Sequence, residues 1–158
     1  MSVTRTFTVT VVSTDSGNKY FIDGVQQDTV YLAEGRTYRF DQSDSSNSTH
    51  PLRFSTTSDG SHGGGSEYTT GVTTNGTAGQ AGAYTEITVA TSAPTLYYYC
   101  TNHSGMGGQA NTPISSYSRT FTITVANPGA GNRYYIDGVL QDTVSLAEGY
   151  TYIFDQSD

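Results

Sequence analysis

The chain has 158 residues and a formal net charge of −7, with 14 acidic side chains against 7 basic ones. Charged residues make up 13% of the chain, about half of the usual share of roughly 25%. Nucleic acids and anionic membrane surfaces both require clustered Lys and Arg, so neither is expected as a partner. No apolar run is long enough to span a bilayer.

Gly, Ser, Thr and Tyr are abundant, and no long apolar stripe with helical spacing occurs. Short alternating or apolar segments instead predict β-strands, separated by turn residues such as the Asp23-Gly24 pair of a tight hairpin. At least seven such strands at this spacing predict an all-β fold, a β-sandwich with Greek-key connections. In chain order, the expected strands lie at 6–12, 19–22, 25–32, 36–44, 50–55, 83–90 and 95–100.

An internal repeat divides the chain. Residues 5–44 align without gaps with residues 119–158, at a constant offset of 114, with 28 identities and 12 differences. A full module is therefore expected at 1–114, a linker at 115–118, and the first strands of a second repeat at 119–158.

The partial repeat is too short to bury a core of its own, so it is expected to leave an apolar face and a sheet edge exposed to water. Three interpretations are open: a fragment of a longer tandem array, strands that complete a neighbouring subunit, or strands that pack on the first module. We favour the first two, because the copy stops just before the segment that holds His50 in the full module.

Four side chains of the full module point to metal chemistry. Cys100, His103 and Met106 form a C-x2-H-x2-M loop, and His50 opens an earlier strand. Two imidazoles, one thiolate and a weak thioether suit copper in both of its oxidation states. Packing roles for Cys100 and Met106, or a Cys100 nucleophile with His103 as its base, are the alternatives. His62, between glycines, is expected to be exposed and outside the site.

In the order His50, Cys100, His103 and Met106, the chain resembles the cupredoxins, the blue copper proteins, and the loop spacing is most similar to that of amicyanin. The resemblance covers about residues 3–112. It implies a β-sandwich with one copper, Cu(I) or Cu(II), bound by these four residues in each full module. One departure is Pro51, since many cupredoxins use the N–H after the first His as a donor to the Cys sulfur. Without that donor we expect a lower reduction potential.

The sequence contains no G-x-S-x-G nucleophile elbow, no phosphate-binding loop and no zinc-protease motif, so an enzyme is not expected. The N-terminus alternates as a strand does and lacks the apolar segment of a signal peptide. Repeated sandwich modules favour a metal-binding, tandem-repeat structural protein, extracellular or in a virion. The expected partners are copies of the same chain or neighbouring repeats, with strands donated by 119–158. The alternative is a soluble type 1 copper protein that transfers electrons to a redox partner.

Overall fold

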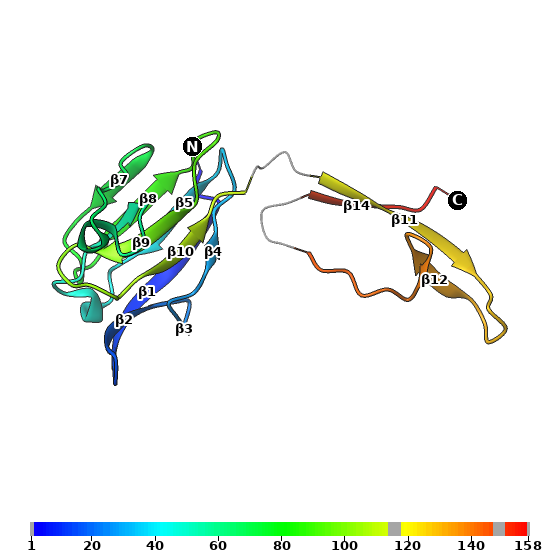
Figure 1. Cartoon of the computed structure of the whole chain (residues 1–158), viewed down its shortest axis with the longest axis horizontal. Coiled ribbons are helices and arrows are strands. Elements are labelled where there is room, and N and C mark those ends of the chain that lie inside the picture. The colour runs from blue at the N-terminus through cyan, green and yellow to red at the C-terminus, as the bar shows by residue number, and fades with distance from the viewer. Residues whose placement is uncertain (1, 114–117, 147–150, 158) are drawn as a thin grey trace. The chain divides into compact units, whose positions relative to one another are not determined.

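The computed structural model describes residues 2–113, 118–146 and 151–157 (Figure 1). The chain divides into two compact units, Met1–Pro113 and Ile114–Asp158. Of the linker expected at 115–118, residues 115–117 lie outside the described residues, and Ser118 begins a strand.

The first unit is an all-β sandwich, which confirms the predicted fold class. Among the described residues, the only helices are the 3₁₀ turns η1 (Ser45–Asn47) and η2 (Gly60–Gly63), and no helix is long and apolar enough to cross a membrane. One sheet has the order β3-β2-β1-β5-β8-β7 and the other has the order β4-β10-β9-β6. The first sheet comprises β1 (Arg5–Thr14), β2 (Gly17–Ile22), β3 (Val25–Gln26), β5 (Thr37–Asp41), β7 (Val72–Asn75) and β8 (Tyr84–Thr88). The second sheet comprises β4 (Val30–Tyr31), β6 (Leu52–Ser55), β9 (Leu96–Cys100) and β10 (Gly108–Asn111).

The hairpin at Asp23-Gly24 forms as the sequence predicts. Both residues have positive φ, 48° and 86°, and Ile22 pairs with Val25 across the turn. The strand expected at 25–32 is different, because it is divided between the two sheets. β3 pairs with β2, Gln27 adopts a φ of 48°, and β4 then pairs in parallel with β10. A left-handed residue ends the first strand and lets the chain cross the sandwich.

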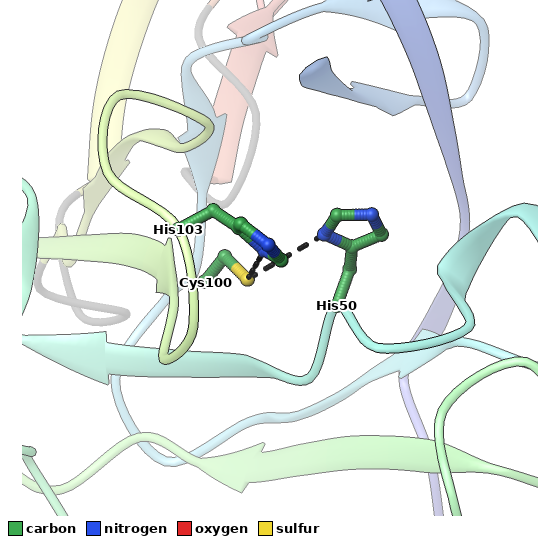
Figure 2. A group of neighbouring side chains, drawn as sticks. All are labelled: His50, Cys100 and His103. Atoms are coloured by element: carbon green, nitrogen blue, oxygen red, sulfur yellow. Dashed lines mark hydrogen bonds between the residues drawn. The ribbon is translucent and has the colours of Figure 1, made fainter.

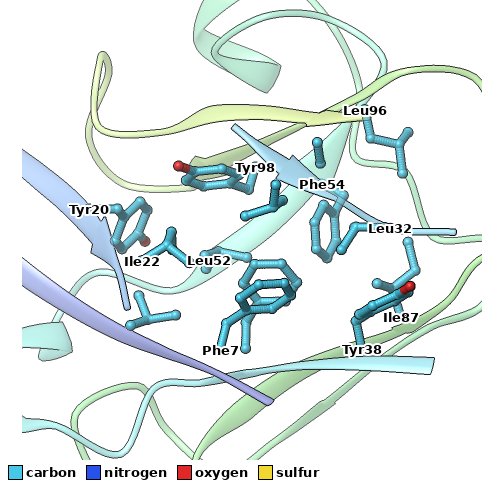
Figure 3. Close-up of a cluster of buried hydrophobic side chains, with 14 of the residues drawn as sticks. Phe7, Tyr20, Ile22, Leu32, Tyr38, Leu52, Phe54, Ile87, Leu96 and Tyr98 are labelled. Carbon is cyan, nitrogen blue, oxygen red and sulfur yellow. The ribbon is translucent and has the colours of Figure 1, made fainter. Parts of the chain in front are cut away.

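Aromatic and aliphatic side chains from both sheets fill the space between them (Figure 3). Phe40 lies at the centre of this core, with its ring centroid 4.9 Å from that of Phe7 and 5.3 Å from that of Phe54. Cys100 and Met106 belong to the same buried cluster. One end of the core therefore carries two of the residues predicted to bind metal.

The second unit repeats four of the six strands of the first sheet. Its sheet has the order β13-β12-β11-β14, with strands β11 (Ser118–Ala126), β12 (Arg133–Ile136), β13 (Val139–Leu140) and β14 (Thr151–Asp155). The four strands correspond to β1, β2, β3 and β5, and they pair in the same arrangement.

The repeat supplies a matched test of core burial. Phe40 is fully buried, whereas Phe154, at the equivalent position of the second unit, is 40% exposed. We expect Phe40→Ala to lower the free energy of unfolding of the first unit by about 3–5 kcal/mol. Phe154→Ala should leave that transition unchanged, and chemical denaturation of both variants measures the difference. Equal losses in both variants would contradict the division into two units.

Candidate metal centre

Strand pairing brings His50 to Cys100 across fifty residues of sequence. In the antiparallel pair of β6 and β9, Leu52 lies opposite Cys100. The ladder continues past the strand ends, because the Thr101 N–H donates to the Pro51 carbonyl at 3.2 Å. The Asn102 side chain then donates to the Thr49 carbonyl at 2.8 Å. The segment that carries His50 is thus held against the loop that carries His103.

Three side chains converge in this place (Figure 2). The Cys100 Sγ lies 3.8 Å from the His50 Nδ1 and 3.7 Å from the His103 Nδ1. Figure 2 shows both imidazole rings directed toward the sulfur, one from the start of β6 and one from the loop after β9. His50 and Cys100 are buried and His103 is exposed, so the site lies at the edge of the core.

The donor set and its spacing fit a metal ion. Metal–sulfur and metal–nitrogen bonds of about 2.3 and 2.0 Å, set at a trigonal angle, separate the two ligand atoms by about 3.7 Å. The observed sulfur–nitrogen distances are 3.7 and 3.8 Å. His50, Cys100 and His103 can therefore hold one metal ion with little displacement of their side chains.

Burial also favours the metal-binding form of His50. Desolvation lowers the pKa of this imidazole, and the neighbouring His103 lowers it further when charged. A metal ion binds the neutral ring, so the lowered pKa keeps that form available. On the far side of the ring, the Asn18 amide nitrogen lies 3.5 Å from the His50 Nε2.

The backbone of His50 is fixed by a second group of polar side chains. Its carbonyl accepts from the Tyr20 hydroxyl at 2.7 Å and from the Gln42 amide at 2.9 Å. The Gln42 oxygen in turn accepts from the Leu52 N–H at 3.0 Å. Pro51 itself has no N–H to donate. The Gln42 side chain instead bonds to the backbone on both sides of Pro51, at the His50 carbonyl and at the Leu52 N–H. Burial raises the pKa of Tyr20, so its hydroxyl remains a donor.

The glycine-rich part of the ligand loop is held by the opposite sheet. The Gly105 carbonyl accepts from the Lys19 ammonium at 2.6 Å and from the Gln27 amide at 3.3 Å. The same Gln27 amide donates to the Gly107 carbonyl. A Cβ at Gly107 would overlap the Tyr98 carbonyl, so only glycine allows this close approach to β9.

The other candidates lie as follows. Met106 is fully buried in the core cluster, and its carbonyl accepts from the Tyr20 N–H at 3.0 Å. His62 is exposed, as predicted, and its ring contacts the Cys100 carbonyl rather than the sulfur. Tyr98 packs in the core, and Tyr99, on the other face of β9, is buried against the η2 segment.

Sequence reasoning did not identify Tyr20, Gln42 and Asn18 as supports of the site. Tyr20 and Asn18 are 30 and 32 residues from His50, and Gln42 is 8 residues from it. Nothing in their local sequence pattern distinguishes them from other polar residues of the chain. Their role becomes visible only when the two sheets are stacked.

No protein-family model matches the chain, and no curated protein is similar enough to be matched to it. The evidence for a metal centre is therefore the donor set, its spacing and its burial.

Replacement of Gln42 tests whether its hydrogen bonds position the His50 backbone. We expect Gln42→Ala to lower the free energy of unfolding by about 1–3 kcal/mol, because it leaves the buried Leu52 N–H without its acceptor. It should also weaken metal binding about tenfold, because it releases the backbone of His50. Denaturation and a Zn(II) competition titration measure the two effects. Gln26→Ala, at an exposed position, is the control, and unchanged affinity in Gln42→Ala would refute the positioning role.

Proposed function

We propose that this chain is a copper-binding, cupredoxin-like module of a tandem-repeat structural protein. The observation that carries the proposal is the Cys100 sulfur, buried and flanked by two imidazole nitrogens at 3.7 and 3.8 Å. One soft thiolate and two imidazoles form a donor set that binds both Cu(I) and Cu(II). The resemblance to cupredoxins adds the Met106 thioether as a weak fourth ligand, and burial of Met106 in the cluster that contains Cys100 supports this assignment.

A structural role is supported by the repeat. Residues 119–158 copy the first strands of the module, and a lone carrier domain has no evident use for such a copy. Modules of this composition, rich in Ser, Thr and Gly with few charges, suit an extracellular or virion assembly. In that setting, copper would link the His50 segment to the last loop and stabilise the folded module by binding only the native state. Other copies of the chain or neighbouring repeats would be its partners.

A second candidate, a soluble type 1 copper protein that transfers electrons, is favoured by one observation. His103 is exposed while the other two converging ligands are buried. An exposed ligand offers a short path between the metal and a redox partner. Pro51 would leave the thiolate a stronger donor, and we expect a lower reduction potential for that reason.

Titration with Cu(II) tests the metal assignment. We expect one equivalent of copper per chain, an intense blue thiolate-to-copper band and a narrow copper hyperfine splitting in the EPR spectrum. Cys100→Ser should abolish the band, and His103→Ala, which removes an exposed ligand without opening the core, should lower copper affinity at least tenfold. His62→Gln is the matched histidine control and should bind copper as the parent chain does.

Copper uptake that survives Cys100→Ser, or a colourless protein in all four chains, would overturn the assignment. In that outcome Cys100 and Met106 are core packing residues, and His103 is an ordinary exposed histidine.

Removal of residues 115–158 separates the two functions. If strands of the second repeat are donated between chains, residues 1–114 should lose higher-order assembly in analytical ultracentrifugation and keep the copper band. If the protein is an electron carrier, the same deletion should change neither the reversible redox couple nor the mass in solution. A full-length chain that is monomeric in dilute solution contradicts strand donation.

A further inference from the structure

The second unit exposes several side chains that the first unit buries, whereas Phe121 and Ile123 are buried as Phe7 and Val9 are. Tyr134 is 61% exposed, Leu146 53% and Phe154 40%, whereas the equivalent Tyr20, Leu32 and Phe40 are all fully buried. We call these three side chains of the second unit, together with Val125, the docking face. Exposed apolar side chains grouped on one sheet face indicate a surface that another structure covers.

The sheet behind the docking face already has the geometry of a complete module. Phe121 pairs with Phe154 as Phe7 pairs with Phe40, and the register of every shared strand pair keeps the offset of 114. Asp137 accepts from the Arg119 side chain and from the Thr122 N–H, as Asp23 does in the first unit from Arg5 and Thr8. A partner would therefore meet a preformed surface.

Most positions that differ between the two repeats lie outside the buried core of the first unit. Of the 12 positions that differ, 11 are exposed or half-buried in the first unit. The single buried difference is Val9, which is Ile123 in the second copy and remains apolar. The second copy thus keeps the residues needed to pack against a second sheet, although the described structure leaves several of them exposed.

A hollow of about 550 Å³ adjoins the docking face, lined by Val125, Asn132, Arg133, Tyr134 and Gln141. Four of these residues correspond to Asn18, Lys19, Tyr20 and Gln27, which contact His50 and hold the carbonyls of the ligand loop in the first unit. Three of the four are identical, and Arg133 replaces Lys19 with another cationic donor. The hollow therefore lies where a complete module holds its metal-binding loop.

The edge of the second unit's sheet at β14 also indicates that a partner strand is absent from the described structure. β14 ends the four-stranded sheet, whereas its counterpart β5 pairs on that side with β8 over the register Thr37↔Thr88 to Asp41↔Tyr84. An unpaired edge offers N–H and C=O groups to an incoming strand. The chain has one segment with the required pattern, residues 45–113, and in the first unit that segment is already paired with β4 and β5.

We propose that strands β11, β12, β13 and β14 form a docking site for a polypeptide segment with the pattern of residues 45–113, and that docking creates a second metal centre. The incoming segment adds a strand beside β14 and covers the docking face. Its His and its C-x2-H-x2-M loop enter the hollow, where Tyr134 and Gln141 hold its carbonyls. The metal part of this proposal rests on the proposed function, while the docking part rests on packing alone.

Docking is tested with the full-length chain carrying Cys100→Ser and a fluorescent peptide of sequence 45–113. We expect saturable 1:1 binding by anisotropy, weakened at least tenfold by Tyr134→Ala and by Gln141→Ala. Val139→Ala is the matched control and should have no effect, because Val139 is 52% exposed and its counterpart Val25 remains 53% exposed in the complete module. Absence of binding, or binding indifferent to Tyr134 and Gln141, overturns the proposal.

Copper titrations of the parent chain and of the Cys100→Ser chain with peptide distinguish the second metal centre from the proposed function. The Cys100→Ser chain lacks the thiolate, so a blue band that forms in its mixture with the peptide, and not with the peptide alone, reports the second centre, and we expect one copper per complex. If the parent chain alone binds copper and the mixture does not, the second centre is overturned and the proposed function stands. If neither binds copper while the peptide docks, the proposed function and the second centre both fail, and docking is supported.

Discussion

The antiparallel pairing of β6 with β9 is the contact on which the candidate site depends. Both strands lie in the second sheet and pack into the core, with Phe54 on one and Tyr98 on the other. The register that buries these rings also places His50 beside Cys100. A shift of one residue would turn the apolar side chains outward, so core burial and ligand geometry select the same register.

The first sheet supports the site from the other side of the core. Tyr20 and Gln42 reach across to the His50 carbonyl, and Lys19 and Gln27 hold the glycine-rich loop. The ligands thus belong to one sheet and most of their polar supports to the other. The site exists only when the sandwich is closed, and this explains why half a module can keep its sheet and still present an open hollow.

The repeated strands illustrate how much a local pattern determines. The hairpin at Asp23-Gly24 recurs in the second unit with the same partners, because turn chemistry and alternation are local properties. The parallel pair of β1 and β5 recurs as well. The burial of the same residues recurs only in part: Phe121 and Ile123 are buried as Phe7 and Val9 are, whereas Tyr134 is exposed and Tyr20 is buried. Burial depends on what lies opposite, and that information is outside the strand. For the same reason, the division of the strand expected at 25–32 was missed, since it follows from the crossing of Gln27 to the second sheet.

The sequence by itself determined the all-β class, the repeat, the tight turn and the four candidate ligands, because these depend on residue type and spacing along the chain. Tertiary structure alone decided that His50 Nδ1 and His103 Nδ1 both lie within 3.8 Å of the Cys100 sulfur, and that Gln42 supports them. The physical reason is that the pairing of β6 with β9 brings His50 to Cys100 across fifty residues, and the stacking of the two sheets brings Gln42 to the His50 carbonyl. No short-range pattern encodes either of these arrangements.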